Sequence, residues 1–251
     1  MTTSETNETC DAILGGALRV IQPRGGYRFA IDSILLARFA IVRARDRVLD
    51  LGAGSGVLSL AIAALHRPRE VIALEIQAEL VAMIRRSTAL NRIDSIRAVA
   101  ADLRTLQQEL PQAGFDVVVA NPPYRADKTG RISPNAARHL ARAETSARLE
   151  DFVAAAERYV RRGGRAAFVF TADRSAELIA LLRSNTMEPK RMRFVHPYID
   201  APATMMLVEA RKHGRTEIAI EPPLILYDAP HIYSREARTM LGEVASPASA
   251  R

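Results

Sequence analysis

Four consecutive residues, Asn121-Pro122-Pro123-Tyr124, place a side-chain amide, two prolines and an aromatic ring at the end of an apolar run. The run, residues 115–120, predicts a buried parallel strand. Two prolines remove two backbone donors and stiffen the exit from the strand, and a residue that precedes a proline is held extended. The turn therefore presents an amide oxygen, carbonyl oxygens and a ring face, which together suit a planar substrate that carries an NH2 group.

These four residues are the candidate catalytic group, because a conjugated NH2 group is a poor nucleophile until its lone pair is freed. The side-chain oxygen of Asn121 and the carbonyl of Pro122 can accept its two hydrogens, which pulls the nitrogen toward tetrahedral geometry. Pro123 stiffens the turn, and Tyr124 can stack on the ring that bears the amine. No strong general base is required, since positioning and hydrogen bonding lower the barrier to a direct in-line displacement.

A glycine-rich turn follows another apolar run, and its sequence is Asp50-Leu51-Gly52-Ala53-Gly54-Ser55-Gly56. Glycines permit positive φ and let a ligand approach the backbone closely. Ligands of open α/β sheets sit beyond the carboxyl ends of the strands. The spacing here is G-x-G-x-G, whereas the dinucleotide fingerprint is G-x-G-x-x-G. Alone, the pattern fits either a cofactor loop or a tight turn without a ligand.

Two acidic residues follow the next two predicted strands. Glu75 closes an apolar run, where a carboxylate would accept hydrogen bonds from ribose hydroxyls, although an acidic strand end is also a common solvated feature. Asp102 is placed to accept from an adenine amino group or to cap a following helix.

These residues must be positioned by a regular alternation of strands and helices. Predicted strands cover residues 47–51, 71–75, 96–100, 115–120 and 165–170, and predicted helices cover 57–65, 78–90, 149–160 and 178–182. Such an alternation predicts an α/β fold with a doubly wound, mostly parallel sheet. Residues 193–195 and 205–210 predict a terminal antiparallel hairpin.

Bulk composition limits the partners and the compartment. The net charge is +7 and the sequence pI is about 10.0, which favours a polyanionic partner. Only three of the 35 basic residues are lysines, so GC-rich codon usage explains the charge equally well. A single cysteine, Cys10, excludes an internal disulfide framework, and no metal-ligand spacing is present. No membrane span or secretory signal is evident, and a cytoplasmic location is expected.

The glycine turn, Glu75, Asp102 and Asn121-Pro122-Pro123-Tyr124, in that order on successive strands, resemble the class I S-adenosylmethionine-dependent methyltransferases. The Asn-Pro-Pro-Tyr form is similar to the subset that methylates amino groups. The resemblance implies a seven-stranded Rossmann-like sheet that ends in an antiparallel hairpin, and S-adenosyl-L-methionine as cofactor. It implies cofactor contacts from Asp50, Gly52, Ala53, Gly54, Gly56, Glu75, Ile76, Asp102, Leu103 and Asn121.

A narrower resemblance covers nearly the whole chain. The leading segment, residues 22–37, and the tail, residues 221–227, are similar to those of bacterial tRNA-Val adenine-N6 methyltransferases. In that family the leading segment helps to close the cofactor pocket, which implies contacts from Phe29 and Asp32. This chain has Arg-Phe-Ala-Ile-Asp where that family's enzymes have Lys-Val-Gly-Thr-Asp. The expected substrate is structured RNA, tRNA in particular.

Composition and the resemblance together predict a single methyltransferase domain with four parts. Residues 1–11 form a disordered tail, 12–45 a segment that closes over the cofactor, 46–212 the catalytic core and 213–251 a C-terminal extension.

A basic loop follows the Asn-Pro-Pro-Tyr turn immediately. Its candidate phosphate contacts are Arg125, Lys128, Arg131, Arg138 and Arg142. Phosphate contacts there would position an RNA over Tyr124, while the alternative interpretation is a solvated run of charge.

Four alternatives remain. Protein-glutamine N5 methyltransferases share the motif but carry a helical domain before the glycine turn, where this chain has 49 residues before Asp50. Many guanine-N2 rRNA methyltransferases prefer Phe after the prolines and carry a second domain. DNA adenine methyltransferases usually need a target-recognition domain. A non-catalytic RNA-binding paralogue predicts damage to Asn121 or to the glycine turn, and both are intact.

Overall fold

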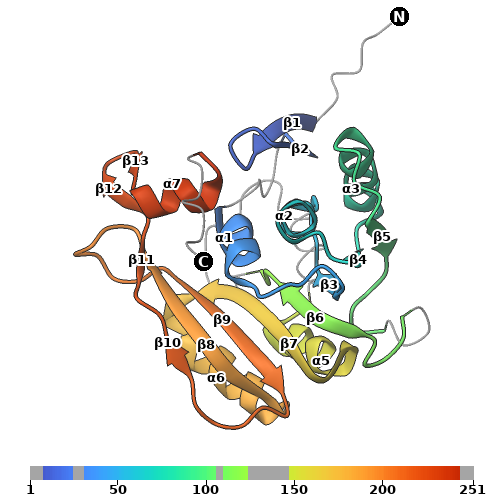
Figure 1. Ribbon diagram of the computed structural model, residues 1–251. Coiled ribbons are helices and arrows are strands. Elements are labelled where there is room, and N and C mark those ends of the chain that lie inside the picture. Colours follow the sequence, from blue (N-terminus) through green and yellow to red (C-terminus); the bar gives the residue numbers. More distant parts are fainter. Residues whose placement is uncertain (1–7, 25–30, 106–109, 124–146, 244–251) are drawn as a thin grey trace, which may run out of the picture.

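The computed structural model describes residues 8–24, 31–105, 110–123 and 147–243 of the 251-residue chain (Figure 1). A mixed sheet forms its centre, in the strand order β10-β8-β9-β7-β6-β3-β4-β5, and β11 also pairs with β8. The long strands are β3 (Arg47–Leu51), β4 (Glu70–Glu75), β5 (Ile96–Ala100), β6 (Phe115–Ala120), β7 (Val160–Thr171), β8 (Met187–His196) and β9 (Met205–Lys212). Strands β5, β4, β3, β6 and β7 are parallel, and β9 runs antiparallel to β7 and β8.

The central parallel strands, β4, β3 and β6, are covered on both faces, which explains why most of their residues are apolar. Residues 117–120 of β6, three valines and an alanine, are all 0% exposed. Helices α1 (Ile31–Phe39), α2 (Val57–His66) and α3 (Ala78–Leu90) cover one face, and α5 (Leu149–Tyr159) and α6 (Ser175–Ser184) cover the other (Figure 1). A short helix, α7 (Arg235–Leu241), packs beside α1, and a 3-10 turn, η2 (Ala172–Arg174), follows β7.

The predicted fold class is confirmed, and the predicted hairpin is the pair β8 and β9. Over the described residues, however, the sheet has nine strands, and the expectation of seven was wrong. The two additional strands, β10 (Ala219–Ile220) and β11 (Leu224–Ile225), have two residues each and run beside β8. They pair with β8 on the side away from β9. Without them, β8 would be an edge strand with unpaired backbone groups on that side.

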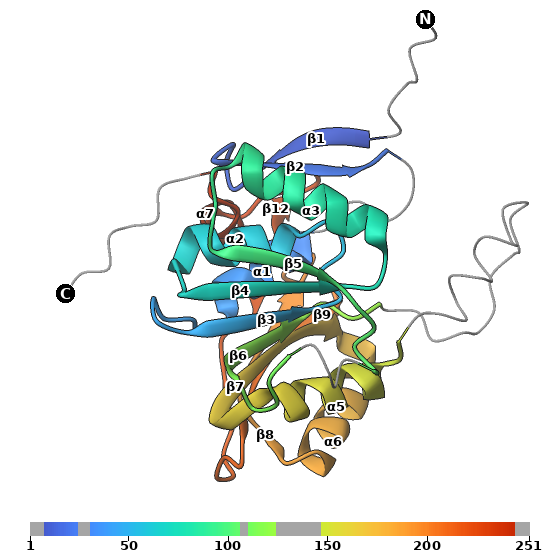
Figure 2. The ribbon, with the colours of Figure 1, turned by 90° about the vertical axis from the view of Figure 1, so that its right-hand side faces the viewer.

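The prediction of a disordered tail through residue 11 was also wrong for residues 8–11. Strand β1 (Glu8–Ile13) pairs with β2 (Leu18–Pro23) as an antiparallel hairpin that lies over α3 (Figure 2). The backbone N–H of Ile21 donates to Ser87 Oγ at 2.9 Å, and Arg86 pairs with Glu8 at 2.7 Å. Polar composition suggested disorder, but these side-chain contacts across the sequence hold the segment in place.

A second small sheet lies in the C-terminal part, where β12 (Tyr227–Ala229) pairs with β13 (Ile232–Tyr233). Among the described residues, no helix is long and apolar enough to span a membrane.

Candidate active site

The predicted site residues that follow β3, β4 and β6 lie at one end of the sheet, where these parallel strands have their carboxyl ends. Strand β3 lies between β4 and β6, and the chain order reverses at this point, so the crevice beyond the carboxyl ends of β3 and β6 is the expected ligand site. Leu51 pairs with Leu74 on one side and with Ala120 on the other. The glycine turn, Glu75 and Asn121 therefore leave the sheet side by side.

The glycine turn has a conformation that only glycine adopts easily. Gly52, Gly54 and Gly56 have φ values of 68°, 57° and 85°. A Cβ atom on Gly56 would lie 2.9 Å from Ile84 Cγ1, whereas a Cβ atom on Gly54 would meet nothing within 4 Å. Gly56 thus allows close packing of α3, and Gly54 faces open space. The turn therefore leaves room for a ligand to lie against the backbone at Gly54, which fits the cofactor that the sequence implies.

Ala53 fastens the centre of this turn to the sheet. Its N–H donates to the Leu74 carbonyl at 2.8 Å, and its side chain is 9% exposed. This hydrogen bond therefore fixes the position of the turn relative to β4.

Glu75 holds the same turn from the neighbouring strand. Its Oε2 accepts from the N–H of Gly54 at 2.9 Å, and its Oε1 accepts from the N–H of Gln77 at 3.0 Å. Each carboxylate oxygen has more than one lone pair, so these bonds leave acceptor capacity for ribose hydroxyls. Beside it, Ile76 is 45% exposed, and we expect this apolar side chain to contact the adenine ring of a cofactor.

Asp50 lies beneath the turn and is only 1% exposed. Ser59 Oγ, on α2, donates to Asp50 Oδ2 at 2.6 Å. Burial raises the pKa of Asp50 to about 7, the hydrogen bond from Ser59 opposes this rise, and the charge of Glu75 adds to it. The geometry makes Asp50 a support that ties β3 to α2.

This burial predicts a pH-dependent stability. The unfolded chain loses the Asp50 proton near pH 3.8, while the folded protein keeps it up to about pH 7. Between these values the folded state binds more protons, so the free energy of unfolding falls as the pH rises and levels off above about pH 7. Asp50→Asn removes this term, and we expect its stability relative to wild type to improve by on the order of 4 kcal/mol between pH 4 and pH 8. Urea unfolding of both proteins at four pH values measures the difference, and a pH-independent difference would contradict it.

Asp102 is engaged in a local contact. Its carboxylate forms an ion pair with Arg104 at 2.6 Å, and its Oδ1 accepts from the Arg104 N–H at 2.9 Å. The hydrogen bond from Arg104 lowers the pKa of Asp102, so the carboxylate is charged. If Asp102 also accepts a hydrogen bond from the adenine amino group of a cofactor, its carboxylate must bond to that group and to Arg104 at the same time. Leu103 is 8% exposed, and its side chain belongs to the core beneath the edge.

Asn121 is held by a residue that the sequence pattern did not single out. Its Nδ2 donates to Ser33 Oγ at 3.1 Å, across 88 positions of the chain. Ser33 lies in the first turn of α1, and its backbone N–H donates to Oδ1 of the buried Asp32 at 2.9 Å. The leading segment therefore reaches the carboxyl edge of the sheet. The only sequence signal for Ser33 was its place beside Asp32 in that segment.

The two prolines after Asn121 differ in exposure, since Pro122 is buried and Pro123 is exposed. Seven predicted site residues lie outside the described residues: Phe29, Tyr124, Arg125, Lys128, Arg131, Arg138 and Arg142.

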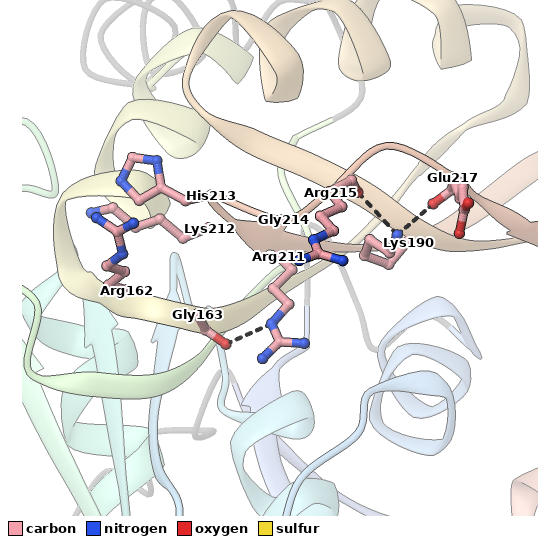
Figure 3. A pocket seen from close by; sticks show the side chains of 9 residues that line it. All are labelled: Arg162, Gly163, Lys190, Arg211, Lys212, His213, Gly214, Arg215 and Glu217. Carbon is pink, nitrogen blue, oxygen red and sulfur yellow. Dashed lines mark hydrogen bonds between the residues drawn. The ribbon is translucent and has the colours of Figure 1, made fainter.

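A basic hollow of about 420 Å³ lies elsewhere (Figure 3). Its lining is Arg162, Gly163, Lys190, Arg211, Lys212, His213, Gly214, Arg215 and Glu217. It lies where β7 begins and β9 ends, at the opposite end of the strands from Asn121. Lys190 Nζ donates to the carbonyls of Arg215 and Glu217 at 3.0 and 2.7 Å, so this lysine fastens the lining loop (Figure 3). The lining of the hollow contains no residue of the glycine turn.

The sheet order and the contents of its carboxyl edge define a class I methyltransferase, for which S-adenosylmethionine is the methyl donor. The family described as "Methyltransferase small domain" matches residues 29–189, more than half of the chain, and the chain belongs to this family.

Known proteins of similar sequence carry more specific names. The chain is 29% identical over 218 residues to a tRNA1(Val) (adenine(37)-N6)-methyltransferase of Tolumonas auensis, which covers 86% of this chain and 88% of that protein. A protein of the same name from Parabacteroides distasonis is 28% identical, covering 71% of this chain and 74% of that protein. A solved structure from Agrobacterium tumefaciens, described as "a predicted O-methyltransferase", has a TM-score of 0.68 and 27% identity, covering 84% of this chain and 96% of its own.

Proposed function

We propose that this protein transfers a methyl group from S-adenosylmethionine to an exocyclic amino group, adenine N6 in a tRNA. The observation that carries the proposal is the position of Asn121, at the carboxyl end of β6 and beside the glycine turn after β3. An amide and a proline carbonyl at this position are acceptors for an NH2 group. The names of the relatives at 28% and 29% identity support adenine in tRNA.

The cofactor, when bound, supplies an electrophilic methyl group on a sulfonium. We expect the backbone at Gly54, the carboxylate of Glu75 and the exposed side chain of Ile76 to hold its nucleoside part, with Asp102 toward the adenine amino group. Asp50 and Leu103 are buried, and we expect them to support the residues that hold the cofactor. Phe29 and Asp32 belong to the segment that we expect to close over it.

The chain's own contribution to the chemistry is hydrogen bonding and alignment. Asn121 Oδ1 and the Pro122 carbonyl accept the two N–H hydrogens of the target amine, which concentrates its lone pair along the line of attack. Tyr124 stacks on the base and fixes its plane. The proton leaves after transfer, when the nitrogen is acidic, so no strong base is required.

Two acceptors favour an amine over a hydroxyl as target. A hydroxyl offers one hydrogen, and it would leave one of the two acceptors without a donor. A protein glutamine amide and guanine N2 both offer an NH2 group and remain the alternative substrates, so the experiment must separate these three.

The test is transfer of a tritiated methyl group from S-adenosylmethionine to total RNA from a strain that lacks the gene. Nucleoside mass spectrometry of the product then identifies the methylated base. We expect N6-methyladenosine in the tRNA fraction. N2-methylguanosine, or transfer to protein with none to RNA, would overturn the adenine assignment.

The basic loop gives a prediction about RNA binding. Neutralising Arg131 and Arg138 should weaken the affinity for RNA and reduce the slope of log K against log salt by roughly 0.7 for each lost phosphate contact. Arg162 and Arg215, in the basic hollow at the opposite edge, provide a matched control pair. Filter binding at several salt concentrations measures both, and an unchanged slope for the loop pair would refute its role.

A further inference from the structure

Three tyrosines of the C-terminal part, Tyr198, Tyr227 and Tyr233, form an aromatic cluster. The rings of Tyr227 and Tyr233 are stacked, with their centroids 4.9 Å apart and an angle of 17° between their planes. The ring of Tyr198 lies 5.7 Å from that of Tyr227, at an angle of 39°. All three residues are half-buried, so each keeps part of its surface in contact with solvent. Tyr227 is thus the middle ring of the three.

The cluster lies at the same end of the sheet as Asn121. Strand β9 runs antiparallel to both β7 and β8, so β8 is parallel to β6 and its carboxyl end points the same way. Tyr198 is two residues beyond the end of β8, and the Tyr227 N–H donates to the Pro197 carbonyl at 2.9 Å. The small sheet of β12 and β13, which carries Tyr227 and Tyr233, leads into α7 beside α1 (Figure 1).

The spacing between the cluster and Asn121 suits a nucleic acid. Strands β9 and β7 separate β8 from β6, so the ends of β8 and β6 are about 14 Å apart across the sheet, at roughly 4.8 Å per strand. This distance corresponds to roughly four stacked nucleotides at about 3.4 Å each. An RNA whose target base lies at Asn121 can therefore bring neighbouring nucleotides to the tyrosines.

The surface beside the rings is apolar rather than basic. Ile199 and Ile232, each next to one of the tyrosines in the sequence, are 79% and 58% exposed. Asp200 and Asp228 are also exposed there. These carboxylates disfavour phosphate contacts at the rings, whereas aromatic and apolar side chains suit the flat faces of unpaired bases.

We propose that Tyr198, Tyr227 and Tyr233 form a stacking platform for unpaired bases that flank the target nucleotide of the RNA substrate. The inference rests on the proposed function, because it requires an RNA at Asn121. Tyr198 and its exposed neighbour Ile199 contact the base, and the stacked pair of Tyr227 and Tyr233 supports Tyr198. The platform contributes affinity without an ion pair, unlike the phosphate contacts expected of the basic loop.

The first test compares two variants at Tyr198. Tyr198→Ala should weaken the binding of total tRNA by roughly tenfold, because it removes the ring on which a base stacks. Tyr198→Phe keeps the ring and should bind like wild type. In both variants the slope of log K against log salt should stay unchanged, because no phosphate contact is lost. Filter binding at several salt concentrations measures affinity and slope, and thermal unfolding checks the fold of each variant.

The second test uses fluorescence, because the chain contains no tryptophan. Tyr198→Trp keeps an aromatic ring and introduces a single reporter, which a stacked base quenches. We expect total tRNA to quench it, and a fully paired RNA duplex, whose bases are not free to stack, to leave it unchanged. The matched control is Ile220→Trp. Ile220 is 64% exposed in β10 and pairs with Met192 in the middle of β8, away from the cluster, so neither RNA should quench this variant.

Four results would overturn the inference: wild-type affinity in Tyr198→Ala, a reduced salt slope in that variant, tRNA bound to Tyr198→Trp without quenching, or equal quenching of Ile220→Trp. A change in the fluorescence of Tyr198→Trp with protein concentration alone would also overturn it, since a second copy of the chain would then cover the rings. These experiments need no methyl transfer. Quenching by tRNA together with no methylation of RNA by the wild-type protein would therefore count against the proposed function and leave the platform as an RNA-binding surface.

Discussion

Replacing Asn121 by alanine is expected to lower the rate of methyl transfer by roughly 10²–10³-fold or more, the range found when one preorganised hydrogen-bonding group is removed from an active site. The variant loses the side-chain oxygen that we expect to accept a hydrogen bond from the target amine. The Pro122 carbonyl, the other expected acceptor, remains. The glycine turn, Glu75 and Ile76 are unchanged, so we expect the affinity for S-adenosylmethionine to stay within a few-fold of wild type.

Single-turnover methyl transfer and isothermal titration calorimetry measure the two quantities separately. Asn121 directly follows β6 and is half-buried, so its truncation should move the melting temperature little, and thermal unfolding provides the control for folding. Equal losses of rate and cofactor affinity would place Asn121 chiefly in the cofactor site and contradict its proposed contact with the amine.

The elements that carry the site were predictable because their sequence pattern is a direct consequence of burial. Strands β3 and β6 begin and end at the predicted residues, 47–51 and 115–120. In a parallel strand that is covered on both faces, most side chains are apolar, so the end of the apolar run marks the end of the strand, although Asp50 in β3 and Asp116 in β6 interrupt the pattern. The residues immediately after each strand then lie at the carboxyl edge.

The errors have a different physical origin. Strands β10 and β11 have two residues each, and their pairing with β8 is set by tertiary contacts that no short sequence pattern encodes. The hairpin β1–β2 contains polar side chains that bond to α3, which local composition does not reveal. In both cases, contacts with residues distant in the sequence stabilise the strands.

The same reason explains what was missed in the site. Ser33 contacts Asn121 only because folding brings α1 beside it, and a lone serine in a helix carries no signal of its own. The resemblance implies a cofactor contact from Asp50, which stays a prediction, and the structure adds the buried hydrogen bond from Ser59 that no sequence pattern indicated. The tertiary structure determines whether a polar side chain contacts a ligand directly or supports another residue that contacts it.

Glu75 combines both kinds of role, and its replacement is the second large effect that we expect. Glu75→Ala should weaken binding of S-adenosylmethionine by roughly 100-fold, since it removes the expected acceptor for the ribose hydroxyls and leaves the Gly54 N–H without its carboxylate, each worth about 1–3 kcal/mol. Glu70→Ala is the matched control, because Glu70 begins the same strand at the opposite edge and pairs with Arg47 at 3.1 Å.

Calorimetric titration of the cofactor measures this loss, and the stability of the same variant provides an independent readout. The charge of Glu75 contributes to the raised pKa of Asp50, so in Glu75→Ala that pKa should fall and the free energy of unfolding should decline less between pH 4 and pH 7 than in wild type. If cofactor affinity and this pH dependence both stayed unchanged, Glu75 would neither bind the cofactor nor act on Asp50. If only the pH dependence changed, Glu75 would act on Asp50 without contacting the ribose.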